Sequence, residues 1–152
     1  MIRRYAPLRL TFAIALALPA GCSTEDTLID SEGRVFDRIA PDAAINLNGT
    51  EPFWSLAIAP SIADEGYTAT YSTPEDIEGT SFAATRFAGN NGLGFSGALQ
   101  EQPVQIAITP GECSDGMSDR TYPYTASVRI GETLLEGCGS TSEEPFTGPA
   151  SP

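Results

Sequence analysis

Apolar and polar residues alternate with a period of two over most of residues 45–138. Positions between the apolar residues, such as Gln105, Thr125 and Ser127, are polar. Because successive side chains of a β-strand point to opposite faces, this pattern is typical of strands with one buried face. The regular apolar positions are Ile45 and Leu47; Trp54, Leu56 and Ile58; Tyr67, Ala69 and Tyr71; Leu93, Phe95 and Leu99; Val104, Ile106 and Ile108; and Tyr124, Ala126, Val128 and Ile130. With the less regular runs at 82–87 and 134–138, the pattern predicts about eight strands.

Turn residues separate these runs. Asn90-Asn91-Gly92 lies between two of them, and Gly131-Glu132 has the composition of a two-residue hairpin turn with Gly in first place. Short strands that follow one another roughly every 8 to 15 residues predict an all-β fold, either a small closed antiparallel barrel or a sandwich.

The N-terminus has the parts of a secretory signal peptide. Arg3, Arg4 and Arg9 precede an apolar run from Leu10 to Leu18, and small residues follow it. The run is too short to span a bilayer, which takes about 20 apolar residues. We therefore expect residues 1–21 to be a signal peptide and the remainder to be exported.

The end of this segment, Leu18-Pro19-Ala20-Gly21-Cys22, resembles the lipobox of bacterial lipoproteins. Ala-Gly-Cys matches that box, whereas Pro19 stands where Leu is usual, so ordinary cleavage after Ala20 is the alternative. The resemblance implies that Cys22 is lipidated and anchors the protein in a membrane. Ser23 follows Cys22, where Asp would retain an enterobacterial lipoprotein in the inner membrane, so the outer membrane, facing the periplasm, is favoured.

The chain contains three cysteines, Cys22, Cys113 and Cys138. If Cys22 carries the lipid, the other two form an even pair in an oxidising compartment, which favours a disulfide. A Cys113–Cys138 bridge closes a loop of about 25 residues and contributes about 3.5 kcal/mol in the chain-entropy model. Free thiols that bind a metal or act as a redox couple are the alternative.

The segments on either side of the periodic region differ from it in composition. Residues 22–42 are rich in Asp, Glu, Ser and Arg, which predicts a lipidated N-terminus and a flexible tether. Apolar residues within the tether suggest a short helix against the domain; these are Leu28, Ile29, Val35, Phe36 and Ile39. Residues 139–152 lack any period and are expected to be a disordered tail, so the β domain is expected to span residues 43–138.

The charge and two missing residue types limit the function. Removing residues 1–21 takes three of the eight arginines and none of the 20 acidic residues, which changes the net charge from −12 to −15. This charge disfavours nucleic acid as a partner and suits a cationic partner or plain solubility. The chain has no His and no Lys, which excludes His-dependent nucleophilic catalysis, imidazole metal ligands and Lys-dependent chemistry. We therefore expect a protein that is not an enzyme and needs no cofactor or metal.

Two segments carry candidate site residues. In the first, Trp54 begins a strand and is expected to close the core, while Phe53 points to the opposite face, where it is a candidate anchor at a binding rim. In the second, Asp115-Gly116 is a turn pair, and Asp119 is expected to cap the turn or to pair with Arg120. Arg120 is also expected to bridge to Glu51 across the barrel end. The spacing of a calcium loop is absent.

Together these segments resemble an uncharacterised family of small bacterial envelope proteins, which are predicted lipoproteins or membrane-associated proteins. The resemblance is carried by Gly49-x-Glu51-Pro52-Phe53-Trp54, by Cys113-x-Asp115-Gly116-Met117-Ser118-Asp119 with Tyr122-Pro123-Tyr124, and by Leu135-x-Gly137-Cys138. It implies an exported β domain with a Cys113–Cys138 bridge and supplies no activity.

Three functions are compatible with these observations. The preferred one is a binding or accessory lipoprotein of the cell envelope that engages a protein or a glycan. One alternative is an inhibitor of a cationic lysozyme-like enzyme, since small periplasmic lysozyme inhibitors are also disulfide-bridged barrels and a charge of −15 complements a basic target. The other is a small glycan hydrolase that uses two carboxylates facing one cleft.

Overall fold

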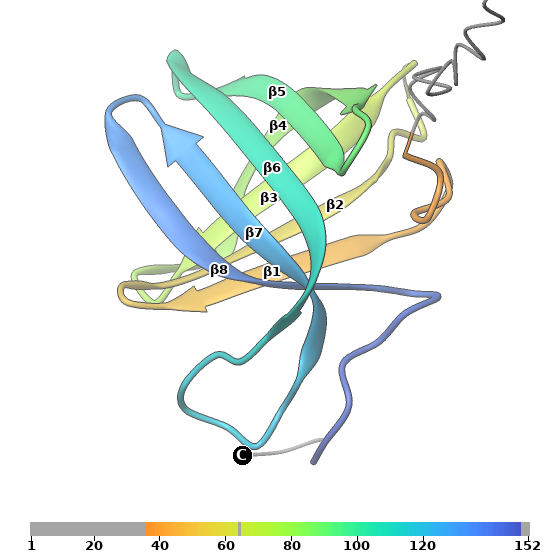
Figure 1. Ribbon diagram of the computed structural model, residues 1–152. Helices are drawn as coiled ribbons and strands as arrows, with labels where there is room; N and C mark the ends of the chain where they lie inside the picture. The colour runs from red at the N-terminus through yellow and green to blue at the C-terminus, as the bar shows by residue number, and fades with distance from the viewer. Residues whose placement is uncertain (1–35, 64, 150–152) are drawn as a thin grey trace, which may run out of the picture. The chain divides into compact units, whose positions relative to one another are not determined.

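The computed structural model describes residues 36–63 and 65–149, which contain eight antiparallel strands closed into a barrel (Figure 1). Each strand pairs with the next, and β8 pairs with β1. The strands are β1 (Ile45–Thr50), β2 (Phe53–Pro60), β3 (Tyr67–Thr73), β4 (Asp76–Ala88), β5 (Leu93–Leu99), β6 (Gln102–Cys113), β7 (Tyr122–Ile130) and β8 (Thr133–Thr141). The prediction of an all-β fold with about eight strands is confirmed, and of its two forms the chain adopts the barrel. The signal peptide, Cys22 and the first part of the tether lie outside the described residues.

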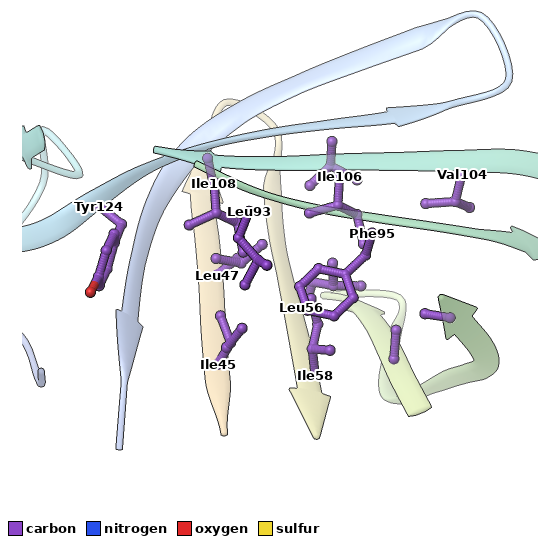
Figure 2. Close-up of a cluster of buried hydrophobic side chains, with 14 of the residues drawn as sticks. Ile45, Leu47, Leu56, Ile58, Leu93, Phe95, Val104, Ile106, Ile108 and Tyr124 are labelled. Atoms are coloured by element: carbon purple, nitrogen blue, oxygen red, sulfur yellow. The ribbon is translucent and has the colours of Figure 1, made fainter. Parts of the chain in front are cut away.

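The interior of the barrel is filled by the apolar residues of the alternating pattern. Figure 2 shows side chains from β1, β2, β5, β6 and β7 meeting inside the barrel. Nearly all the predicted core positions are buried, while Tyr67, Tyr71 and Ile130 are half-buried at the margin. Burying each Leu, Ile or Val side chain contributes about 1.5–3 kcal/mol, so this interior supplies most of the stabilisation of the fold.

Four turns of two residues lie at one end of the barrel, which we call the hairpin end. Their flanking pairs are Thr50 with Phe53, Thr73 with Asp76, Leu99 with Gln102, and Ile130 with Thr133. Gly131 has φ of 59°, as the predicted Gly-first turn requires. Gln100 and Glu101 also have positive φ, at 48° and 69°. The sequence does not reveal that turn, because it contains neither Asn nor Gly, the residues that usually mark a turn with positive φ.

The segment before β1 packs against the barrel, so the flexible-tether prediction is wrong for residues 36–42. Ile39 is 1% exposed and joins the core. The backbone N–H of Phe36 donates to the Gly89 carbonyl at 2.7 Å, and Arg86 Nη2 donates to the Ile39 carbonyl at 2.9 Å. Residues 36–44 contain no helix. They are held by the apolar side chains of Phe36, Ile39, Ala40 and Ala43 and by bonds to backbone carbonyls, a combination that leaves no periodic pattern in the sequence.

The segment after Cys138 is also ordered, so the disordered-tail prediction is wrong for residues 139–149. β8 continues to Thr141, and its last three residues are buried. Thr147 forms a β-bridge with Thr121, and the Phe146 ring lies 5.5 Å from the Tyr122 ring. Polar contacts and a single aromatic hold this segment, which is why hydrophobic periodicity does not detect it.

A polar cluster joins the two flanking segments. Arg38 Nε and Nη2 donate to both carboxylate oxygens of Glu144 at 2.9–3.1 Å, and Tyr124 Oη donates to Glu144 Oε2 at 2.7 Å. The Arg38 bonds, followed by the Tyr124 bond, lower the pKa of Glu144, while burial raises the pKa of Tyr124 to about 12. The Arg38 side chain is 47% exposed, so the ion pair itself adds little stability. Its effect is to connect both flanking segments to β7.

Candidate functional site

The hairpin formed by β6 and β7 extends beyond the body of the barrel (Figure 1). We call residues 110–122, which begin with a register shift between Pro110 and Cys113, the overhanging hairpin. It is tied to β8 by the predicted Cys113–Cys138 disulfide, whose Cα atoms are 5.6 Å apart. It is tied to β1 by a bond of 3.0 Å from Thr50 Oγ1 to the Asp115 carbonyl. Cys138 follows the inward-facing Gly137, so it points outward, yet it is 1% exposed because the hairpin covers it.

A groove of about 780 Å³ lies between the overhanging hairpin and the outer face of the barrel. Its floor carries small polar side chains of the outer face, including Thr109, Thr125 and Ser127. Its lining includes three carboxylates and no arginine; the carboxylates belong to Glu51, Asp115 and Glu136. We call it the acidic groove.

The acidic groove brings together parts of all three sequence motifs. Its lining includes Gly49–Glu51 of the first, 113–117 of the second, and Gly137 and Cys138 of the third. These segments lie far apart in the sequence and meet because β1 pairs with β8 and the disulfide holds the hairpin on β8. Glu136 was not predicted as a site residue, and Met117, which is 66% exposed, was named only as a member of the second motif. Glu136 gave a weak signal, because it is the polar residue between the apolar Leu135 and the motif pair Gly137-Cys138.

The structure separates Arg120 from Glu51, so the predicted bridge between them is wrong. Arg120 Nε donates to the Pro149 carbonyl at 2.9 Å, and its guanidinium carbon lies 4.5 Å from the Phe146 ring centroid. The guanidinium of Arg120 therefore contacts the C-terminal segment, whose position the sequence did not indicate. Asp119, next to it, is exposed.

The Asp115 carboxylate organises the overhanging hairpin. Its Oδ1 accepts from the backbone N–H groups of Met117 and Ser118 at 3.0 and 2.8 Å, and its Oδ2 accepts from Ser118 Oγ at 2.7 Å and from Tyr122 Oη at 3.3 Å. The two bonds from Ser118 are the main reason that the pKa of Asp115 is lowered to about 2. Asp115 therefore stays ionised at neutral pH.

Replacing Asp115 with Asn should destabilise the protein by about 1–2 kcal/mol near neutral pH, because Asn retains only part of this set of charge-assisted bonds. The native pKa is below the ordinary value, so in the wild type this stabilisation is present above about pH 4 and is lost as the pH falls towards 2. The Asn variant lacks this contribution, so its difference from wild type should shrink over the same range.

Urea denaturation at several pH values from 2 to 7 measures this difference. Asp119→Asn is the matched control, since it removes an exposed carboxylate four residues away. A difference between wild type and Asp115→Asn that does not change with pH would contradict the assignment.

Trp54 lies in the core, as predicted, and is 3% exposed. Its indole occupies the space beside two inward-facing glycines. A Cβ at Gly49 would lie 2.7 Å from Trp54 Cε2, and one at Gly137 would lie 2.8 Å from Trp54 Cζ2. Real Cβ atoms do not approach that closely, so both positions require glycine to accommodate the indole. The glycines of the first and third motifs are thus explained by packing.

A second depression, of about 330 Å³, lies on the other side of β1 at the hairpin end. Phe53, Pro74 and Ile77 line it, and Phe53 and Ile77 are 52% and 81% exposed. We call it the apolar hollow. The predicted exposure of Phe53 is confirmed, whereas Ile77 was missed because it follows the Pro74-Glu75-Asp76 turn region without any alternation.

No group of three or more His, Cys, Asp or Glu residues in the described ranges is arranged to hold a metal ion. No helix in those ranges is both long and apolar enough to cross a bilayer.

Comparisons with protein-family models, curated proteins and solved structures found no match. The acidic groove and the apolar hollow are therefore the two candidate sites of this chain.

Proposed function

We propose that this chain is a lipid-anchored binding or accessory module of the bacterial cell envelope, and that it binds its partner through the hairpin end of the barrel. The observation that carries the proposal is the exposure of Phe53 and Ile77 beside the apolar hollow. The barrel buries apolar residues from all of its strands and leaves six large apolar side chains exposed among the described residues. Of these six, Phe53 and Ile77 line the apolar hollow. Exposed aromatic and aliphatic side chains beside a depression are typical of binding surfaces.

The anchoring part of the proposal rests on the sequence. The lipobox-like segment ending at Cys22 supports lipidation, and Ser23 supports the outer membrane with the domain facing the periplasm. Pairing of Cys113 with Cys138 leaves Cys22 as the one cysteine outside the disulfide, as lipidation requires.

A catalytic role has less support from the geometry. A glycan hydrolase needs a protonated carboxyl as general acid, and burial or a nearby negative charge usually raises the pKa of that group. Asp115 is the groove carboxyl with a shifted pKa, and the shift is downward because the hairpin donates hydrogen bonds to it. This carboxylate is therefore suited to holding the hairpin and to providing negative charge.

Capture of partners from a solubilised envelope fraction tests the proposal. With the mature full-length protein as bait, we expect Phe53→Asp to lower the recovery of specific partners by about 10-fold, equivalent to ~1.4 kcal/mol. The reason is that a charge replaces the exposed aromatic next to the hollow. Quantitative mass spectrometry of the captured proteins and glycans measures the change.

Phe87→Asp is the matched control. Phe87 is 72% exposed, and it lies near the end of β4, which is opposite the hairpin end. Both variants should melt close to the wild-type temperature. Equal recovery with Phe53→Asp and Phe87→Asp would refute the assignment of the hairpin end as the binding surface.

A further inference from the structure

The acidic groove and the apolar hollow adjoin each other. Asn48, Gly49 and Thr50, the last three residues of β1, line both depressions. Asn48 and Thr50 point to the outer face, and Thr50 is held by its bond to the Asp115 carbonyl. The end of β1 therefore forms a ridge one strand wide between the two, and an extended ligand that crosses it contacts both.

The lining of the acidic groove contains three carboxylates and no positively charged side chain. Glu51, Asp115 and Glu136 contribute carboxylates. Three of the described arginines have other contacts: Arg38 binds Glu144, Arg86 binds the Ile39 carbonyl, and Arg120 binds the Pro149 carbonyl. Arg129 is exposed on β7, two positions beyond Ser127, and does not line the groove. Complementary charge selects partners and increases their association rate, so a basic group is the natural occupant of this groove.

The apolar hollow selects a different group. The side chains of Phe53, Pro74 and Ile77 line it, and the remaining lining consists mainly of small hydroxyl-bearing or amide-bearing residues. An apolar side chain placed there removes exposed surface of Phe53 and Ile77 from water. A glycan would stack on the aromatic ring of Phe53, but a neutral glycan has no positive charge to bind in the acidic groove.

We propose that the partner is a protein segment in which a bulky apolar side chain, seated in the apolar hollow, stands next to an Arg or Lys side chain, seated in the acidic groove. This rests on the proposed function and adds the chemistry of the partner. Recognition of both groups together is more selective than recognition of either alone, because a partner that has only one of them leaves the other depression unfilled.

Selection of a random peptide library displayed on phage against the mature full-length protein tests this inference. We expect enrichment of peptides with an aromatic or large aliphatic residue within about two positions of Arg or Lys, the distance that an extended chain covers across the ridge. The strongest peptide is then synthesised and titrated by fluorescence anisotropy. We expect Glu51→Gln/Glu136→Gln to weaken its binding at least about 10-fold, and to reduce the dependence of binding on salt.

The control is Glu101→Gln/Glu132→Gln, which removes the same charge from two exposed turn residues outside both depressions. It should bind the peptide within about twofold of wild type, a change of ~0.4 kcal/mol. Phe53→Ala should also weaken binding of the peptide, because it removes the aromatic ring that lines the apolar hollow.

Three outcomes overturn the inference: no enriched family, an enriched family without basic residues, or equal weakening by the two double variants. Binding of a soluble peptidoglycan fragment in place of any peptide also overturns it, in favour of a glycan partner. These failures differ from failure of the proposed function. If envelope capture depends on Phe53 but not on Glu51 and Glu136, the binding surface stands and only the basic character of the partner falls.

Discussion

Replacing Trp54 with alanine should lower the free energy of unfolding by about 3–5 kcal/mol, the range observed when a large buried aromatic is truncated. The indole is 3% exposed and fills the space left by Gly49 and Gly137. Neither glycine carries a side chain that moves into a vacated volume, and the backbones of β1 and β8 are held by their pairing. The cavity should therefore remain largely unfilled, which places the cost in the upper part of the range. Urea denaturation followed by far-UV circular dichroism measures it.

Phe53→Ala is the matched control, because Phe53 is the neighbouring residue on the opposite, exposed face of the same strand. Its effect on stability should stay within about 0.5–1 kcal/mol. Gly137→Ala should cost about 1–3 kcal/mol, because its Cβ would collide with the Asn48 backbone carbonyl of β1 as well as with the indole. If Trp54→Ala and Phe53→Ala destabilise equally, the packing described here is wrong.

Removing the disulfide should cost about 3.5 kcal/mol, which is the chain-entropy value for a closed loop of about 25 residues. The two cysteines are separated by 25 positions, and the loop between them contains most of the overhanging hairpin, all of β7 and the first part of β8. Without the bond, the hairpin keeps its contact with Thr50 but loses its covalent attachment to β8. A Cys113→Ala/Cys138→Ala variant should therefore show a lower urea midpoint, with the loss of hairpin order preceding global unfolding.

Addition of a thiol reductant separates the disulfide from the side chains. Reductant should lower the urea midpoint of the wild type towards that of the double variant and leave the double variant unchanged. Hydrogen exchange should show faster exchange of the backbone amides of residues 110–122 in the double variant. A wild-type midpoint that does not respond to a reductant known to have cleaved the bond contradicts a stabilising role.

In the proposed binding mode, residues that stabilise the barrel also take part in recognition. Gly49 and Gly137 accommodate Trp54 on the inside and line the acidic groove on the outside. Asp115 holds the overhanging hairpin and contributes charge to the groove. Substitutions at these positions change both properties, so the binding experiments use Phe53, Glu51 and Glu136, whose side chains lie outside the core.

Several features of the candidate site were predictable from local sequence. Phe53 and Trp54 were assigned to opposite faces because adjacent residues of a strand point in opposite directions. The Cys113–Cys138 pair followed from the number of cysteines together with the expectation that the chain is exported. Arg120 was assigned the wrong partner because Pro149 and Phe146 belong to a segment whose order the sequence did not reveal. Ion pairs and carbonyl contacts depend on which loops meet, and no periodic pattern records this.

The sequence by itself determined the all-β class, the strand count, the buried face of nearly every strand, and turns such as Gly131-Glu132, because these depend on the alternation of neighbouring residues and on local φ preferences. Only the tertiary structure decided that β8 pairs with β1 to close a barrel, that residues 36–42 and 139–149 pack onto it, and that the overhanging hairpin and the end of β1 form the acidic groove beside the apolar hollow. Those features depend on contacts between residues distant in the chain. Such contacts are specified by the shape and hydrogen bonding of the assembled barrel rather than by any local pattern.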